Sequence, residues 1–303
     1  ESRSHRLDKL ARIYDREILP IWAQRFGRMI VHNLELGPKA MVLEVGCKTG
    51  GITFDVLNKL DDKGRIIAID GSSALLDVAR KKAGDLSGKR VFFRTESGTP
   101  RLPFTNDVYD LVYSNLGLAD YPDPKMALRD FARVTRPGGQ VVCTLPLWGT
   151  WGEFHDIYSE VLIKRDNTEV FELLRAHIQS FPQPGTLVRW MNAVGLEQTQ
   201  IEVQEFSLLF KSAREFFFAP IVEFGPLPKW KLIAGQGPAM QDIFWDIKNA
   251  IDAYFSGRAF QITVKAGCVR GTKSDRTPED VPAEDEWIDV DTGEVEVLGQ
   301  GEG

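Results

Sequence analysis

The residues most suited to chemistry lie in one ten-residue stretch, Met41-Val-Leu-Glu-Val-Gly-Cys-Lys-Thr-Gly50. Its first half is a run of apolar β-formers that contains one carboxylate, Glu44, and such a run is typical of a strand buried on both faces. Gly46 and Gly50 then allow a tight turn and the close backbone approach that a bound nucleoside requires. A carboxylate beside this turn predicts a cofactor site, for either a nucleoside or a dinucleotide.

A second carboxylate follows at an informative spacing. The segment Arg65-Ile-Ile-Ala-Ile-Asp70 reads as another buried strand that ends in an acid. Asp70 falls about 20 residues after the turn, which is the spacing expected of an acid that hydrogen-bonds ribose hydroxyls. Gly71 would bring the backbone close as well. The alternative is that Asp70 only caps the helix expected over residues 72–80.

The order of these motifs resembles that of class I S-adenosylmethionine-dependent methyltransferases. Residues 44–50 are similar to the first motif of that family, acidic-x-Gly-x-Gly-x-Gly, with Lys48 in place of the middle glycine. The resemblance implies that S-adenosylmethionine binds at this turn and that position 48 lies beside its methionine moiety.

Two later segments extend the resemblance. Residues 96–104 are similar to the family's acidic-Ala-x-x-Leu-Pro-Phe segment, and a strand ending at Asn115 follows. Counting back from Leu102 puts Gly98 where the family usually holds the adenine amino group. Glu96 could serve only with a shift of two residues and is otherwise a solvated acid. The cofactor site implied by the resemblance consists of Glu44, Gly46, Cys47, Lys48, Gly50, Asp70, Gly71, Ser97, Gly98 and Asn115.

The alternation of strands and helices from Met41 to Leu145 predicts an α/β fold with a doubly wound, mostly parallel sheet. A helix over residues 126–136 should end at Pro137-Gly138, and a fifth strand should follow. The resemblance implies a Rossmann-like sheet of seven strands, the last of them antiparallel, with residues 197–209 and 260–269 as the candidates for strands six and seven.

These elements predict five segments, one of which is an insertion. They are an N-terminal helical cap (1–39), a cofactor-binding α/β core (40–147), a helical lid or insertion that includes strand six (148–258), the final strand (259–271) and an acidic tail (272–303). The insertion is rich in aromatic residues, which either pack its helices or line a lid for an apolar or carrier-bound substrate.

No catalytic group is identified by the sequence. His155 or Asp156, just after the fifth strand, could act as a general base, although exposed polar residues at a helix start are common. Tyr14, in the leading helix, could reach the methionine carboxylate or pack in the core. Methyl transfer mainly needs alignment in a dry pocket, so it need not leave a catalytic motif.

Composition narrows the class of protein. The three cysteines have no metal-ligand spacing and the four histidines are unpaired, so buried thiols, no metal and a cytoplasmic protein are expected. No apolar run reaches membrane-spanning length, and no signal peptide is visible. Residues 115–118 lack the Asn-Pro-Pro-Tyr motif of enzymes that methylate amino groups of nucleic acid bases, so nucleic acid is not expected as a substrate.

The tail differs in charge from the rest of the chain. Residues 272–303 hold 11 acidic and 2 basic residues, a net charge of −9, whereas the whole chain carries −6. Such a segment is expected to be disordered or to bind something basic, and Trp287 would be an anchor for a protein partner.

Three functions follow from these observations. The first is S-adenosylmethionine-dependent methyl transfer to a small or carrier-bound molecule. The second is a catalytically inactive methyltransferase-like subunit that serves binding or assembly, because Lys48 and Gly98 depart from the family pattern. The third is a dinucleotide oxidoreductase, against which the Pro137-Gly-Gly139 signature argues.

Overall fold

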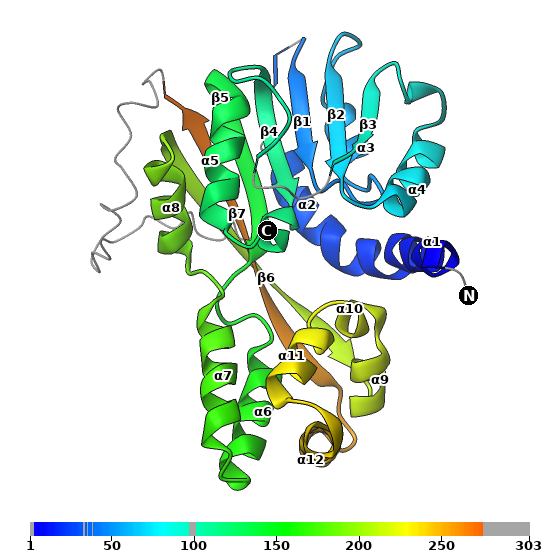
Figure 1. Ribbon diagram of the computed structural model, residues 1–303, viewed down its shortest axis with the longest axis vertical. Coiled ribbons are helices and arrows are strands. Elements are labelled where there is room, and N and C mark those ends of the chain that lie inside the picture. The colour runs from blue at the N-terminus through cyan, green and yellow to red at the C-terminus, as the bar shows by residue number, and fades with distance from the viewer. Residues whose placement is uncertain (1–2, 33, 35, 38, 97–100, 275–303) are drawn as a thin grey trace. The chain divides into compact units, whose positions relative to one another are not determined.

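The computed structural model describes residues 3–32, 34, 36–37, 39–96 and 101–274 (Figure 1). The chain divides into two compact units. The first holds the described residues of Glu1–Leu145, Pro184–Val203 and Gly267–Gly303, and the second holds Pro146–Gln183 and Gln204–Ala266.

Seven strands form one sheet, in the order β3-β2-β1-β4-β5-β7-β6. Their bounds are β1 Met41–Val45, β2 Arg65–Asp70, β3 Val91–Thr95, β4 Tyr109–Asn115, β5 Thr135–Pro146, β6 Leu196–Phe210 and β7 Phe260–Lys273. Strands β1 to β5 pair in parallel. In Figure 1 the arrow of β7 points opposite to those of β1 and β4. The expected seven-stranded, mostly parallel sheet is therefore confirmed.

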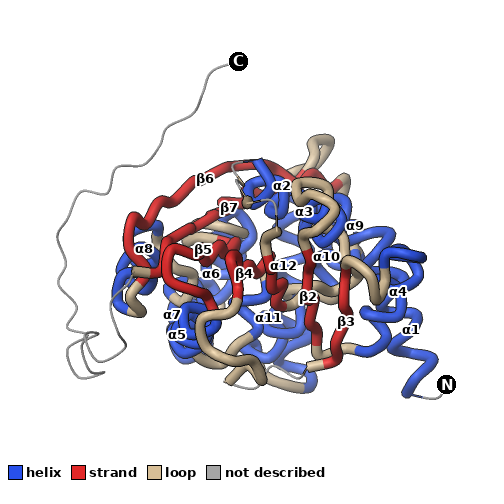
Figure 2. The backbone as a smooth tube through the Cα atoms, turned by 90° about the horizontal axis from the view of Figure 1, so that it is seen from above, coloured by secondary structure: helices blue, strands red, loops and turns tan. Residues whose placement is uncertain are grey.

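Helices lie on both faces of this sheet. In the first unit they are α1 Arg3–Ile13, α2 Gln24–His32, α3 Thr53–Leu57, α4 Ser73–Ala83, α5 Pro124–Val134 and α8 Pro184–Ala193, with the short 3₁₀ turns η2 Gly84–Leu86 and η3 Gly117–Asp120. Figure 2 shows α2 and α3 on one side of β4 and α5 on the other. The near-continuous apolar residues of β1 and β4 are buried because helices cover both faces.

The fifth strand begins earlier than the sequence suggested. Helix α5 ends at Val134, and Thr135 already pairs with Tyr109 of β4. The register shifts between Tyr109 and Leu111, so Pro137-Gly138 lies in an irregularity of the strand rather than at the helix end.

The leading helix is not regular throughout. Between α1 and α2, residues Tyr14–Ala23 form a π-helix, η1, with Pro20 inside it. Proline has no N–H to donate and its ring crowds the preceding turn, which accounts for the widened coil.

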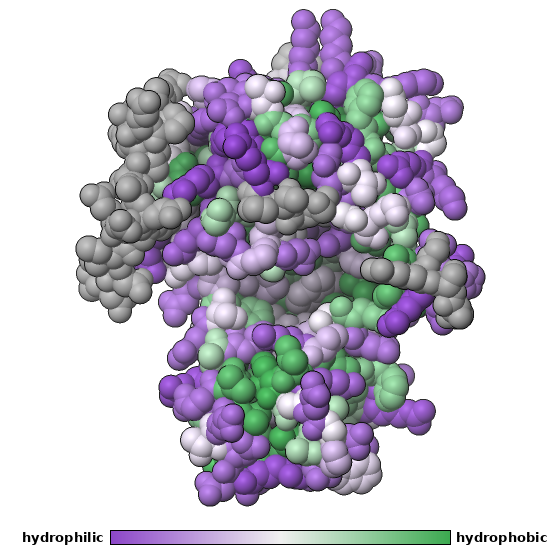
Figure 3. Space-filling model, in the orientation of Figure 1, coloured by the Kyte–Doolittle hydropathy of each residue, from purple (hydrophilic) through white to green (hydrophobic). Residues whose placement is uncertain are grey.

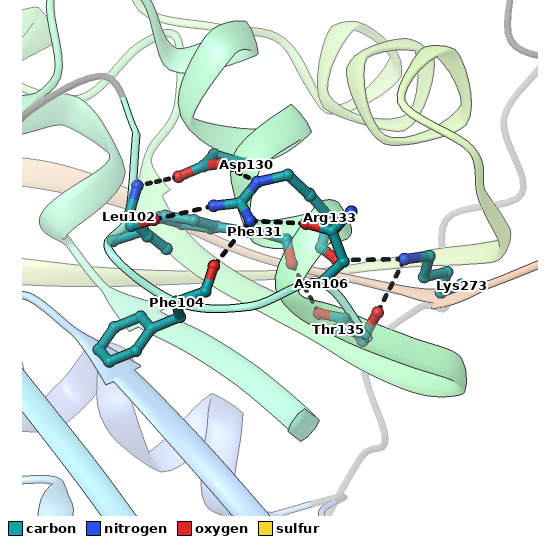
Figure 4. Close-up of polar contacts among 8 residues, drawn as sticks. All are labelled: Leu102, Phe104, Asn106, Asp130, Phe131, Arg133, Thr135 and Lys273. Carbon is teal, nitrogen blue, oxygen red and sulfur yellow. Dashed lines mark hydrogen bonds and ion pairs between the residues drawn. The ribbon is translucent and has the colours of Figure 1, made fainter. Parts of the chain in front are cut away.

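A side-chain network holds the loop at residues 101–107 against α5 (Figure 4). Arg133 donates from Nη2 to the carbonyl of Leu102 at 2.9 Å and from Nη1 to the carbonyl of Phe104 at 2.8 Å. Its Nε lies 2.6 Å from Oδ1 of Asp130, whose other oxygen accepts from the backbone N–H of Leu102. The ammonium of Lys273 in β7 donates to the carbonyl of Thr135 at 2.8 Å. One arginine thus fixes the loop that follows β3.

The second unit is helical with an aromatic interior. Its helices are α6 Gly152–Lys164, α7 Thr168–Gln179, α9 Ala213–Phe218, α10 Pro220–Glu223, α11 Leu227–Ala234 and α12 Gly237–Tyr254. Phe154 stacks on Trp230 with ring centroids 4.0 Å apart, and Phe216 packs 5.2 Å from Phe154. These rings fill the space between the helices of the unit, so many of the aromatic residues of the insertion are core residues. Among the described helices, none is both long and apolar enough to cross a bilayer.

Candidate functional site

A small hollow lies at the carboxyl ends of β1 and β4, within the first unit. It is lined by Tyr14, Leu19, Ala23, Glu44, Gly46, Cys47, Lys48, Gly51, Ile52 and Asn115. Ligands of doubly wound sheets bind outside the carboxyl ends of the strands, where the strand order reverses. Here the order reverses between β1 and β4, so the hollow is at the expected place.

The turn after β1 has the backbone that its sequence predicts. Gly46 and Gly50 have φ of 77° and 74°, and the N–H groups of Gly46 and Cys47 donate to the carbonyl of Ile69 at 2.9 and 3.0 Å. A Cβ on Gly46 would meet the Cα of Gly117 at 3.4 Å. The turn therefore lies in contact with the start of η3, just after β4, and puts no side chain into the hollow at Gly46.

Asp70 ends β2 beside this turn and is buried. Its Oδ2 accepts from the backbone N–H of Lys48 at 3.0 Å, and its Oδ1 accepts from that of Ser72 at 2.9 Å. Ser72, not Asp70, caps α4, since its hydroxyl accepts from the N–H of Leu75. Each carboxylate oxygen has further lone pairs, so Asp70 can still accept hydrogen bonds from ribose hydroxyls.

Glu44 is buried in the floor of the hollow. It accepts a hydrogen bond from the hydroxyl of Thr53, and the phenol of Tyr113 lies beside it. Burial raises the pKa of Glu44 to about 7, against the lowering effect of the Thr53 hydrogen bond, and the charge of Asp70 raises it further. Near neutral pH this carboxyl group can therefore hold a proton.

Lys48 lies in the left-handed region, with φ of 51°. Its Nζ is 2.7 Å from Oδ2 of Asp120 in η3. Burial lowers the pKa of Lys48, but the charges of Asp120 and Asp70 outweigh it and the pKa is raised. The lysine is thus a cation held across the side of the hollow at which the resemblance expects the methionine moiety.

Asn115 and Tyr14 bring the leading segment onto the sheet. The amide of Asn115 donates to the carbonyl of Ala23 at 2.9 Å, and its oxygen accepts from the hydroxyl of Thr144 at 2.7 Å. Burial raises the pKa of the Tyr14 phenol, followed in effect by the charge of Asp70. Asn115 therefore ties Ala23 of η1 to the end of β4, and Tyr14 forms part of the wall of the hollow.

The residues around the hollow are of the types that bind S-adenosylmethionine, but the hollow is too small to hold the cofactor. The carboxylate of Asp70 suits ribose hydroxyls, and the glycine turn offers bare backbone. The hollow, however, measures about 10 Å³, which is room for about one water. With its lining side chains, Lys48 and Tyr14 among them, as they stand, the hollow has no room for the whole cofactor.

The predicted residues fall into three groups. Glu44, Gly46, Cys47, Lys48 and Asn115 line the hollow, and Gly50, Asp70 and Gly71 lie in the adjoining turn and strand end. Ser97 and Gly98 lie outside the described residues. Glu96 is paired with Arg94 at 2.8 Å, and its proposed adenine contact stays a prediction.

The two candidate bases lie in the second unit and differ in exposure. His155 is buried within 5.8 Å of the Trp230 ring, and burial together with His177 lowers its pKa to about 3. A buried imidazole whose pKa is lowered this far is a poor general base near neutral pH, because it holds a proton only weakly. Asp156 is exposed.

Sequence reasoning missed the partners of the site. Thr53 holds Glu44, and Asp120 holds Lys48 from 72 residues away. Leu19 and Ala23 also line the hollow. The apolar type of Leu19 and Ala23 is a signal for their burial, whereas no local pattern marks Asp120.

Comparison with known proteins identifies a family whose sequence model matches this chain. Residues 1–209 match the sequence model of the ubiE/COQ5 methyltransferase family. The demethylmenaquinone methyltransferase of Halalkalibacterium halodurans is 28% identical over 181 residues, which cover 56% of this chain and 72% of that protein. The enzyme of the same name from Staphylococcus epidermidis is 28% identical over 196 residues, covering 61% of this chain and 77% of that protein.

A solved structure shares the fold. The YcgJ protein of Bacillus subtilis aligns with a TM-score of 0.54 and 15% sequence identity, covering 84% of this chain and all of that one. At this identity the likeness concerns the fold alone.

Proposed function

Because the chain belongs to the ubiE/COQ5 methyltransferase family, we propose that it methylates a small, apolar acceptor of the quinone type. Its reaction class is methyl transfer from S-adenosylmethionine to a small molecule, so the predicted function and cofactor are confirmed. The relatives named for demethylmenaquinone support the quinone-type acceptor. The alternative of an inactive subunit finds no support among them.

The observation that carries the proposal is the meeting of Glu44, Asp70 and the glycine turn at the carboxyl edge of β1 and β2. We assign to Asp70 the ribose hydroxyls and to the turn at Gly46 the close approach of the nucleoside. The bound cofactor supplies a methyl group on a positively charged sulfur. The protein mainly has to align the acceptor with that methyl and to exclude water.

Titration calorimetry with S-adenosylhomocysteine tests the cofactor site. Asp70→Asn replaces one of two charged acceptor oxygens by a donor, so we expect binding to weaken by about tenfold or more. Asp77→Asn is the matched control, because Asp77 is an exposed acid on α4 paired with Arg80. Equal affinity of both variants and the unmodified chain would remove Asp70 from the site.

The acceptor is tested separately, by methyl transfer to a reduced naphthoquinone with a short side chain. Transfer to this acceptor supports the proposal. Binding of S-adenosylhomocysteine without any transfer to it would contradict the quinone-type acceptor and favour the carrier-bound acceptor that the sequence left open.

We also propose that residues 1–39 cap the cofactor site and that the acidic segment 272–303 binds a basic protein partner. The hydrogen bond from Asn115 to Ala23 supports the cap. The tail lies mostly outside the described residues, and its net charge of −9 supports a basic partner. Deleting residues 275–303 should leave the thermal midpoint nearly unchanged and weaken the partner interaction, whereas a truncated chain that keeps every partner would contradict the idea.

The proposed location is the cytoplasm. All three cysteines are free and buried, as suits a reducing compartment. Burial raises the pKa of Cys47, Cys143 and Cys268, so they remain uncharged thiols.

A further inference from the structure

The surface of the second unit carries a segment in which large apolar side chains are exposed. We call residues 209–232 the basic apolar segment. It contains α9, α10 and α11, and α10 contacts both of the other two helices. Its exposed apolar side chains are Leu209, Phe218, Phe224 and Leu232, of which Phe218 and Leu232 are 68% and 63% exposed. Figure 3 shows apolar side chains gathered at the surface where α11 lies in Figure 1.

Four cations belong to the same stretch of sequence as these apolar residues. They are Lys211, Arg214, Lys229 and Lys231, all exposed and without an ion-pair partner among the described residues. The segment contains two acids, Glu215 and Glu223, and the carboxylate of Glu215 already accepts from the backbone N–H of Lys211. The segment therefore presents a net positive charge together with exposed apolar area.

Another strongly exposed apolar residue of the same unit has no unpaired cation next to it in the sequence. Ile163 is 65% exposed in α6, but the two cations that follow it are both paired. Lys164 lies 2.5 Å from Glu160, and Arg165 lies 2.6 Å from Asp246. Unpaired cations thus distinguish the basic apolar segment from the surface around Ile163.

A surface that complements this segment has negative charges outside and an apolar interior. Apolar side chains enter the boundary between lipid headgroups and acyl chains, and lysines are attracted to the phosphates. A fluid bilayer also requires no matching shape, which suits side chains spread over three short helices. Unpaired cations gain most from such a surface, since a paired cation would first have to leave its carboxylate.

We propose that the basic apolar segment docks the protein on a membrane surface that contains anionic lipid. Phe218, Phe224 and Leu232 enter the interface, and the four cations contact lipid phosphates. This inference does not depend on the proposed function. The two agree, because an apolar quinone-type acceptor partitions into the same bilayer. Docking would bring the enzyme to its acceptor without a membrane-spanning helix.

Co-sedimentation of the full chain with vesicles tests the proposal. We expect binding to phosphatidylcholine vesicles with about 30 mol % phosphatidylglycerol, and much weaker binding to pure phosphatidylcholine, because each lysine near an anionic surface contributes about 1 kcal/mol. Lys229→Gln with Lys231→Gln should weaken binding about 30-fold. Leu232→Gln with Phe218→Ser should weaken it at least about tenfold, and added salt should act on the charge component alone.

Matched variants of the same unit serve as controls. Ile163→Gln removes an equally exposed apolar side chain beside paired cations, and Lys164→Gln removes a paired cation, so both should bind vesicles as the unmodified chain does. Thermal midpoints of all variants should agree, since every changed side chain is exposed.

Two results would overturn the proposal. One is an absence of binding to anionic vesicles by the full chain at low salt. If light scattering then shows that Leu232→Gln breaks a dimer, the surface is an interface between two copies of the chain instead. The other is an equal loss of binding in the Ile163 and Leu232 variants. Calorimetry with S-adenosylhomocysteine should give the same affinity for all these variants, so a failure of docking is separable from a failure of the cofactor site.

Discussion

The ammonium of Lys48 lies 2.7 Å from the carboxylate of Asp120, and this ion pair joins the glycine turn to the 3₁₀ turn after β4. The lysine occupies a left-handed backbone position that a glycine would adopt without strain. Its partner is 61% exposed, so the pair is screened by water and contributes about 0–1 kcal/mol to stability. Stability alone therefore gives no reason for a lysine at this position.

Replacing Lys48 by glycine should leave the affinity for S-adenosylhomocysteine equal or improve it. The change removes a side chain from the wall of a hollow that is too small for the cofactor, and it relieves a strained φ. Calorimetry measures the affinity. Asp120→Asn is the control, because it weakens the ion pair without clearing the space. A loss of tenfold or more, about 1.4 kcal/mol, would show instead that the ammonium is a ligand.

Glu44 should make the protein less stable as the pH rises. Its pKa is raised from 4.5 to about 7 by burial, so the folded state holds a proton that the unfolded state has lost between these values. This contribution is fully present below about pH 4.5 and is lost as the pH rises through about 7. Relative to Glu44→Gln, the unmodified chain should lose about 3 kcal/mol of unfolding free energy between pH 5 and 8.

Urea unfolding of both chains at several pH values measures this difference. Glutamine can still accept from Thr53 and carries no charge, so the variant isolates the titration of Glu44. Parallel pH profiles of the two chains would mean that Glu44 remains ionised in the folded state.

His155 should make the protein less stable as the pH falls. Burial and His177 lower its pKa from 6.5 to about 3, so the unfolded state takes up the proton first. Stability from the neutral imidazole is present above about pH 6.5 and is lost as the pH falls, by about 2 kcal/mol at pH 5. His155→Phe should keep the aromatic packing and flatten the acid side of the profile. An unchanged acid side in His155→Phe would contradict this role of His155.

Arg133 should be irreplaceable by lysine. Its guanidinium serves Asp130 and the carbonyls of Leu102 and Phe104 at once, and an ammonium cannot span them. We expect Arg133→Lys to cost about 3 kcal/mol of unfolding free energy, because Asp130 is left buried and poorly paired. Arg80→Lys, in an exposed pair with Asp77, should change it by less than about 0.5 kcal/mol. An equal effect of the two changes would contradict the structural role of the loop network.

The sequence alone determined the strands and turns that build the cofactor edge. The apolar runs before Glu44 and Asp70 and the glycines at 46 and 50 act through local rules of side-chain alternation and backbone freedom, so their places could be predicted within a few residues. The family resemblance added the antiparallel last strand.

Only the tertiary structure decided which polar groups already have hydrogen-bond or ion-pair partners within the protein. Asn115 was predicted as a cofactor ligand, but its amide and oxygen bond Ala23 and Thr144, and Lys48 meets an acid 72 residues away. The early start of β5 depends on its pairing with β4 in the same way. Such contacts join residues that are distant along the chain, and packing selects them by geometry rather than by any local pattern. The same holds for the unpaired cations of residues 209–232, because a lysine is free only when the folded chain brings no carboxylate to it.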